Sequence, residues 1–193
     1  MSNNTKKTSP CKVITGPNTV FSYLFINEPK VPLGGGTPKY SASLIIPKSD
    51  TVTYNKIKKA IEAAYLEGES KLRGTGKTVP ALEDLKTPLR DGDKDRKGDE
   101  VYKGCWFINA NSTTKPGVVD AACNQILDSA ELYSGIRGRA SITLYAYNSS
   151  GNRGIACGLN NIQKLADGAP LGGRSRAEDD FAELDDEEDG FLD

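Results

Sequence analysis

Residues 137–147 have the sequence RGRASITLYAY, in which apolar and polar side chains alternate. Successive side chains of a β-strand point to opposite faces, so Ile142, Leu144 and Ala146 share one face of this segment. Two arginines, two tyrosines, a serine and a threonine share the other face. This period of two predicts a strand with one face in the core and the other in water.

Four further segments favour strands, because each is rich in β-branched or aromatic residues and is bounded by turn-forming residues. They are residues 20–26, 39–47, 102–111 and 153–162. One long segment favours a helix: an N-cap is available at Ser49 or Asp50, and apolar residues then recur at helical spacing over about 20 residues. We therefore expect a mainly β fold with one main helix. The expected architecture is a five-stranded Greek-key barrel of the OB type, with an amphipathic helix, long loops and a disordered acidic C-terminal tail.

The charged residues are divided unevenly along the chain. Residues 178–193 contain ten of the 26 acidic residues and no base. The other 16 acids and all 25 Lys and Arg lie in residues 1–177, whose net charge is therefore +9. The acidic segment cannot fold by itself, because its charges repel one another and it has little apolar surface to bury. A basic body with an acidic appendage indicates a protein that binds a polyanion and carries its own competitor.

The length of 193 residues is suited to one domain with flexible ends. The composition places the boundaries of the expected parts. These are a flexible N-terminus at 1–15, an OB domain at 16–168, a Gly/Arg linker at 169–177 and an acidic tail at 178–193.

The chain contains no histidine, which removes the commonest general base and the usual partner of a nucleophilic Ser or Cys. Its four cysteines are far apart and form no Cys-x-x-Cys pair, and the chain shows no secretory leader and no long apolar run. We therefore expect a protein of the reducing cytoplasm that does not bind membranes. We expect it not to be an enzyme, and to use no cofactor and no metal.

The polar face of residues 137–147 has the side chains that single-stranded nucleic acid requires. Arg137 and Arg139 can pair with phosphates, and Tyr145 and Tyr147 can stack on unpaired bases. The alternative is a solvated sheet face whose tyrosines only supply β-propensity.

Residues 102–111 present a second group of aromatic side chains. Tyr102 and Trp106 share one face, whereas Lys103 and Phe107 share the other. One of Trp106 and Phe107 must belong to the core and the other must be more exposed. The sequence leaves open which is which.

Two short motifs resemble ligand sites. GTGKT lacks the spacing of a phosphate-binding loop and follows a helix instead of preceding one. Asp91, Asp93 and Asp95 have the spacing of a calcium loop, but Arg96 stands where that loop requires glycine. A solvated charged loop is the ordinary interpretation. A carboxylate-metal nuclease or resolvase that uses these aspartates and Asp99 is the enzymatic alternative.

Four longer strings carry a resemblance to a known family. They are KYSASLIIPKSDTVTYNKIKKAIEAAY, LKTPLRDGDKDRKGDEVYKGCWFINANSTTKPGVVD, ELYSGIRGRASITLYAYNSSGNRGIACGLNNIQKLADG and GGRSRAEDDF. From about Tyr40 to Phe181 the chain resembles the phage and prophage single-stranded DNA-binding proteins once catalogued as a domain of unknown function. That family is similar to OB-fold replication proteins of lytic phages, in which a basic groove holds single-stranded DNA and an acidic tail contacts replication or recombination enzymes. Several related tails end on an aromatic residue, whereas here Phe191 is followed by Leu192 and Asp193.

The resemblance implies a sequence-independent protein that coats and protects single-stranded DNA in phage-type replication, recombination and repair, in the cytoplasm of the infected or lysogenic bacterial host. The residues expected to bind the strand are Lys39, Lys48, Lys103, Trp106, Phe107, Arg137, Arg139, Tyr145, Tyr147 and Arg153. The tail is expected to compete with DNA and to recruit phage or host proteins such as a polymerase, helicase-primase, exonuclease or annealase. Its expected contact residues are Asp185, Asp186, Glu187, Glu188, Asp189, Phe191 and Leu192. A homodimer is left open, and an assembly protein that acts through the tail without binding DNA is the second alternative.

Overall fold

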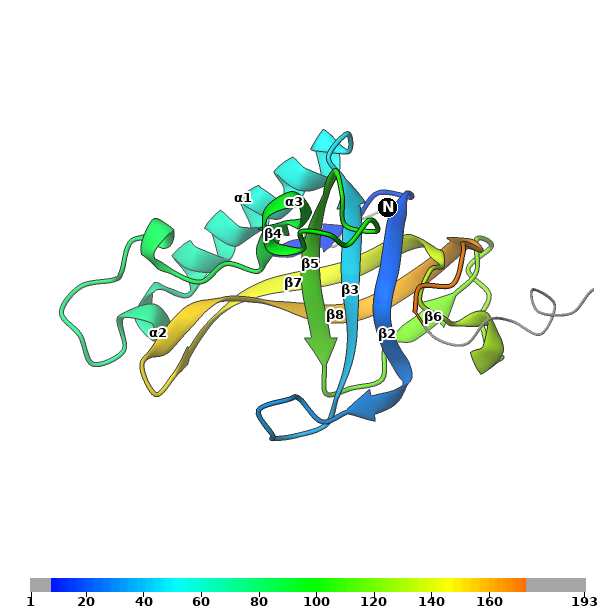
Figure 1. Ribbon diagram of the computed structural model, residues 1–193. Coiled ribbons are helices and arrows are strands. Elements are labelled where there is room, and N and C mark those ends of the chain that lie inside the picture. The colour runs from blue at the N-terminus through cyan, green and yellow to red at the C-terminus, as the bar shows by residue number, and fades with distance from the viewer. Residues whose placement is uncertain (1–7, 173–193) are drawn as a thin grey trace, which may run out of the picture.

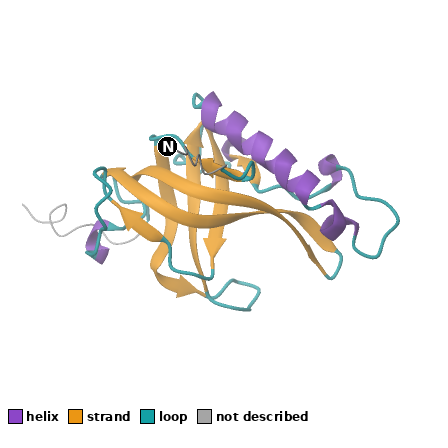
Figure 2. Cartoon of the chain, turned by 180° about the vertical axis from the view of Figure 1, so that it is seen from behind, coloured by secondary structure: helices purple, strands orange, loops and turns teal. Residues whose placement is uncertain are grey.

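The computed structural model describes residues 8–172, which form a curved sheet with one long helix packed against it (Figures 1 and 2). The strands are β1 (Lys12–Ile14), β2 (Thr19–Lys30), β3 (Lys39–Pro47), β4 (Leu89–Asp91), β5 (Cys105–Ser112), β6 (Gly117–Val119), β7 (Arg137–Ser149) and β8 (Asn152–Ala166). The helices are α1 (Thr51–Glu67), α2 (Glu69–Arg73) and α3 (Gly92–Asp95), with 3-10 turns η1 (Leu82–Asp84) and η2 (Ser129–Glu131).

Five strands close into a barrel. Strand β2 pairs with β3, β3 with β5, and β7 with β8, all antiparallel, whereas β5 and β8 are parallel. The circuit closes where Thr19 and Val20 of β2 pair with the start of β7. Figure 1 shows β2, β3 and β5 side by side, with β7 and β8 crossing behind them. The mainly β, OB-type fold predicted from the sequence is therefore confirmed.

The core lies inside this barrel, and the alternation along β7 is the one predicted. Ile142, Leu144 and Ala146 are at most 5% exposed and point inward, whereas Arg137 and Arg139 are exposed. The neighbouring strands supply the rest of the core in the same alternating way. Its largest members include Phe21, Ile26, Leu44, Ile46, Ile108 and Ile142.

Helix α1 begins at a side-chain cap that also ties it to the barrel. Asp50 accepts hydrogen bonds from the backbone N–H of Thr53 at 3.0 Å and from its hydroxyl at 2.6 Å. The same hydroxyl accepts a hydrogen bond from the N–H of Gly16, which follows β1, at 2.8 Å. An apolar stripe that includes Ile57 and Ile61 then packs on the core, as helical spacing requires.

The sheet begins before the expected domain boundary at residue 16. Lys12–Ile14 form β1, which pairs with β7, although they fall within the expected flexible N-terminus at 1–15. Val13 is only 4% exposed and lies between two exposed neighbours. Strand β1 therefore joins the sheet with a single apolar side chain in the core. Most of the expected linker at 169–177 and all of the expected tail at 178–193 lie outside the described residues.

Gly68 joins α1 to α2 where no side chain fits. A Cβ atom at this position would lie 2.1 Å from the Cβ of Ala146 on β7. Gly68→Ala should therefore lower the free energy of unfolding by about 1–3 kcal/mol, because the added methyl group overpacks the junction. The measurement is urea unfolding. A Cβ atom added to Gly34 would meet no other atom within 4 Å, so Gly34→Ala is the control and should change stability by less than about 0.5 kcal/mol. Equal stabilities of the two variants would contradict this account of the junction.

Candidate nucleic-acid interface

A row of small and polar residues crosses the outer face of the barrel at right angles to the strands. Its members are direct pairing partners from one strand to the next, and directly paired residues point to the same side of a sheet. The row, called the polar row below, consists of Phe25, Ser41, Asn111, Gly158, Thr143 and Lys12, in order across β2, β3, β5, β8, β7 and β1. One chain neighbour of each member lies in the core, which places the row on the outside; these neighbours are Ile26, Ala42, Ala110, Cys157, Leu144 and Val13.

The chemistry of the polar row suits a polyanion with flat bases. None of its six members is acidic, and five have small or polar side chains that let another chain approach closely. The row has a cation at each end, because Lys12 is a member and the Nζ of Lys30 lies 5.2 Å from the ring centre of Phe25. Asn160 donates hydrogen bonds to the hydroxyls of Ser141 at 3.3 Å and Thr143 at 2.9 Å, which fixes the surface beside the row.

Tyr145 and Tyr147 follow the row member Thr143 on the same face of β7, and their rings lie over glycines of β8. A Cβ added to Gly158 would meet the Tyr145 ring at 3.7 Å, and one added to Gly154 would meet the Tyr147 ring at 3.0 Å. Tyr145 is 42% exposed. Partial burial raises the pKa of its hydroxyl, so the ring remains uncharged at neutral pH. Both rings thus lie against the backbone of β8, and neither is buried.

The predicted arginines of β7 continue this face. Arg137 and Arg139 are exposed. The guanidinium of Arg139 donates hydrogen bonds to Oε1 of Gln163 on β8, and the distance from Nε to Oε1 is 3.0 Å. Lys39 pairs with Lys30 where the β2–β3 hairpin leaves the barrel, near the Phe25 end of the row. Lys103 is also exposed, with Glu100 at 3.6 Å, but it belongs to the loop before β5.

Two predicted cations are engaged in the fold. Lys48 lies 2.7 Å from a carboxylate oxygen of Asp91 and 2.6 Å from one of Asp93. Arg153 donates to the backbone carbonyl of Leu72 in α2 at 3.0 Å. Both side chains therefore have partners within the fold, and their contact with phosphates stays a prediction.

The structure separates the roles of Trp106 and Phe107. Phe107 is fully buried on the outer face of β5, because the ring of Tyr102 covers it edge-on at a centroid distance of 5.1 Å. The expectation that Phe107 offers a stacking surface is therefore wrong. Trp106 is partly exposed, but its ring lies 4.8 Å from that of Tyr54 on α1, at the end of the barrel away from the polar row.

The aspartates of residues 91–95 hold α3 in place. Lys48 bonds to both Asp91 and Asp93, Asp93 also accepts from the N–H of Gly104 at 2.9 Å, and Asp95 pairs with Arg90 at 3.0 Å. The hydrogen bonds from Lys48 lower the pKa of Asp91 and of Asp93, so these carboxylates stay charged and bonded at neutral pH. Within residues 8–172, no group of three or more His, Cys, Asp or Glu side chains is arranged to hold a metal ion. In the same range, no helix is long and apolar enough to cross a membrane.

Sequence reasoning missed Tyr23, Phe25 and Arg96. Strict alternation along β2 would place Phe21, Tyr23 and Phe25 on one face. A bulge between Ser22 and Phe25 breaks this alternation, so Phe21 is buried while Tyr23 is 50% exposed. The guanidinium carbon of Arg96 lies 5.4 Å from the ring centre of Tyr23. The three aromatic residues in the string VFSYLFI were the available signal, but the bulge has no visible sequence mark.

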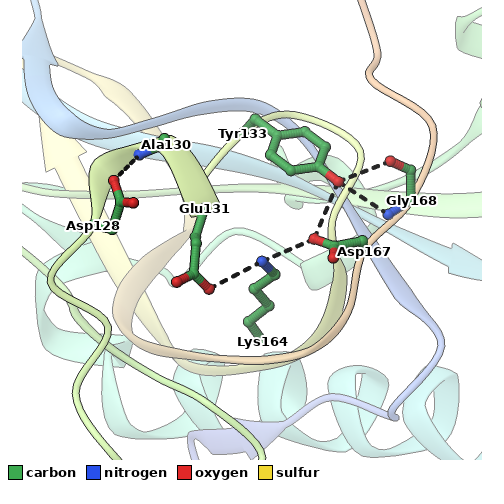
Figure 3. Close-up of polar contacts among 7 residues, drawn as sticks. All are labelled: Asp128, Ala130, Glu131, Tyr133, Lys164, Asp167 and Gly168. Atoms are coloured by element: carbon green, nitrogen blue, oxygen red, sulfur yellow. Dashed lines mark hydrogen bonds and ion pairs between the residues drawn. The ribbon is translucent and has the colours of Figure 1, made fainter. Parts of the chain in front are cut away.

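The C-terminal segment is fixed beside β2. Lys164 at the end of β8 lies 3.4 Å from Glu131 and 2.9 Å from Asp167. The hydroxyl of Tyr133 donates towards Asp167 at 3.2 Å and accepts from the N–H of Gly168 at 3.3 Å (Figure 3). These contacts direct the chain after β8 along the barrel, so Pro170, Leu171 and Gly172 come to line a cavity together with Tyr23 and Phe25.

Comparisons with known proteins identify the family of this chain. The family described as Enterobacter phage Enc34, ssDNA-binding protein, matches residues 11–192. The chain is 29% identical over 161 residues to the putative protein p50 of Acyrthosiphon pisum secondary endosymbiont phage 1, covering 81% of this chain and 85% of the relative.

Two solved structures are also similar. The single-stranded DNA-binding protein from bacteriophage Enc34, in complex with ssDNA, superimposes with a TM-score of 0.67 and 27% identity over 86% of this chain and 96% of that one. The single-stranded DNA-binding protein gp2.5 of bacteriophage T7 shares the fold, with a TM-score of 0.52 and 18% identity over 94% of this chain and 98% of that one. The resemblance seen in the sequence is thus confirmed, and the chain belongs to the family of the Enterobacter phage Enc34 ssDNA-binding protein.

Proposed function

We propose that this protein binds single-stranded DNA along the polar row, without requiring a particular sequence. The observation that carries the proposal is the continuous pairing of non-acidic residues from Phe25 to Lys12 across the outer face of an OB barrel. Outer strand faces and adjacent loops are where OB folds bind oligonucleotides. The Enc34 relative solved in complex with ssDNA supports the same ligand for this chain.

The proposed contacts divide into two kinds. Lys12, Lys30, Lys39, Arg137 and Arg139 would neutralise phosphates. Three aromatic rings would stack on bases: Phe25, at one end of the row, and Tyr145 and Tyr147, which follow Thr143 along β7. The row crosses five gaps between strands of about 4.8 Å each, so its path around the barrel is roughly 24 Å, which is long enough for several nucleotides. Stacking tolerates any base because every base has a π-face.

The proposal extends to the biological role that the family resemblance implies. The protein would coat and protect single strands in phage-type replication, recombination and repair, in the cytoplasm of the bacterial host. The acidic tail at 178–193 would compete with DNA and then recruit partner enzymes through Asp185–Asp189, Phe191 and Leu192, which lie outside the described residues. Because the tail follows Gly172 beside β2, it would meet the basic face at an effective concentration of up to about millimolar.

The stacking role of Tyr145 can be tested by removing and then restoring the ring. Tyr145→Ala should weaken binding of a dT oligonucleotide by about 1–3 kcal/mol, the cost of losing one stacked base. Tyr145→Phe keeps the ring and should bind almost as well as the unchanged protein. Fluorescence anisotropy of a labelled oligonucleotide measures both affinities. A loss of the same size in both variants would show that the hydroxyl, and not stacking, matters.

The phosphate role of Arg139 predicts a change in salt dependence. A single-strand binder loses about 0.7 units of log affinity per unit of log salt for each phosphate it neutralises. Arg139→Gln should therefore reduce this slope by about 0.7, because one phosphate contact is removed. Lys59→Gln removes an exposed charge from α1, outside the polar row, and should leave the slope unchanged. Identical slopes in the two variants would argue against a phosphate at Arg139.

Deletion of residues 178–193 tests the competition between tail and DNA. The shortened protein should bind oligo(dT) more tightly than the full chain, and the difference should shrink as salt screens the tail. The measurement compares the two proteins in the same anisotropy titration. An assembly protein that acts only through its tail would bind no oligonucleotide before or after the deletion.

A further inference from the structure

A cavity of about 630 Å³ adjoins the Phe25 end of the polar row. Four segments that are distant in the sequence form its walls, and the loop before β7 contributes Ser134. Strand β2 contributes Tyr23 and Phe25, the loop before β5 contributes Asp99 and Val101, and the C-terminal segment contributes Pro170–Gly172. The volume falls within the range of small-molecule sites, and the walls are mostly apolar.

Tyr23 is held in this cavity by an unusual backbone. Its φ angle is +46°, in the left-handed region that residues other than glycine rarely adopt. The bulge in β2 imposes this angle and turns the ring outward, where half of it is exposed. Arg96 lies 5.4 Å from the ring centre of Tyr23 and 5.0 Å from that of Tyr102, so one guanidinium joins the bulge to the loop before β5. The aromatic wall is therefore formed before any ligand arrives.

The opposite wall is equally well fixed. The N–H of Leu171 donates to the carbonyl of Ser134 at 2.8 Å. Tyr133, which precedes Ser134 in the chain, forms hydrogen bonds through its hydroxyl with Asp167 and Gly168, as Figure 3 shows. Because both walls are tied to the barrel, the cavity keeps its width, as a slot for a flat group requires.

The charge in the cavity selects among the parts of a nucleotide. Asp99 lines the wall, and one of its carboxylate oxygens accepts from the N–H of Val101 at 3.3 Å. A carboxylate repels phosphate, but it accepts hydrogen bonds from the N–H groups of a base edge. Guanine presents two adjacent donors, N1–H and N2–H₂, which match the two oxygens of a carboxylate. Thymine presents only N3–H, flanked by two carbonyl oxygens.

We propose that this cavity is a base-binding slot that prefers guanine, with Tyr23 and Phe25 contacting the ring and Asp99 accepting from its Watson–Crick edge. The inference rests on the proposed function, because a strand lying on the polar row brings a base to Phe25. The slot adds a preference at one position to binding that elsewhere tolerates any sequence.

The test compares three oligonucleotides of about 12 nucleotides, a length within OB site sizes. One is all thymidine, one has a single central dG, and one has a central deoxyinosine, which lacks the N2 amino group. The full chain should bind the dG strand roughly tenfold more tightly than the other two, the size of effect that paired hydrogen bonds to a base edge give. Asp99→Asn should lose this preference while keeping its affinity for the thymidine strand to within about twofold.

Two further variants make the outcome decisive. Glu100→Gln removes the neighbouring carboxylate, which does not line the cavity, and should keep the preference for dG. Tyr23→Ala removes the aromatic wall and should lose the preference with Asp99 intact. Equal binding of all three strands by the full chain would overturn the proposed slot. The cavity would then hold no guanine, whether it is empty or is filled by the acidic tail. A uniform gain for every strand in Asp99→Asn would also overturn it, since Asp99 would then act only by charge. If no strand binds at all, the proposed function itself fails.

Discussion

The closure of the sheet through β7 is the constraint on which the rest of the structure depends. Strand β7 pairs with β8 along its length and returns to β2 over only two residue pairs. This short contact turns an open sheet with two edges into a barrel with one interior. A shift of one residue in β7 would exchange Ile142 and Leu144 for Ser141 and Thr143 on the inner face. The core and the polar row would be lost together, so one register fixes both stability and the candidate interface.

The outer face of the barrel is divided by residues 91–104, an insertion that contains α3 and the loop before β5. Ile45 and Phe107 are apolar residues on this face and are covered by Tyr102, which also donates to the hydroxyl of Ser43 at 3.2 Å. The ion pairs of Lys48 hold the start of the insertion. Beyond Ser43 the outward residues of β3 are Ser41 and Lys39, which are polar, so they need no cover and the face stays open. Side-chain polarity along β3 and β5 therefore decides where the outer face is accessible.

The sequence predicted those features that depend on one element at a time. The alternation along β7 and a helix cap at Ser49 or Asp50 follow from local patterns; the structure confirms the alternation and places the cap at Asp50. The OB-type barrel was predicted from the set of strands and the helix together, and it is also confirmed. The position of Phe107 depends on a cover supplied by Tyr102, five residues away in an irregular loop, so strand parity alone could not give it. The polar row depends on register between six strands, which no single segment encodes. The bulge at Tyr23 reverses the parity of β2 without any glycine or proline to mark it.

The C-terminal segment follows a defined path along the barrel as far as Gly172. Lys164 and Tyr133 fix Asp167 and Gly168, and the chain then runs along the wall of the cavity at Tyr23. Under the proposed function, the described part of the chain therefore ends at Gly172, beside residues that also face DNA. The tail's competition with DNA is intramolecular and independent of protein concentration, whereas capture of a partner protein is bimolecular. Binding of a strand would release the tail wherever DNA is present, and the partner's concentration alone would then determine how many tails are occupied.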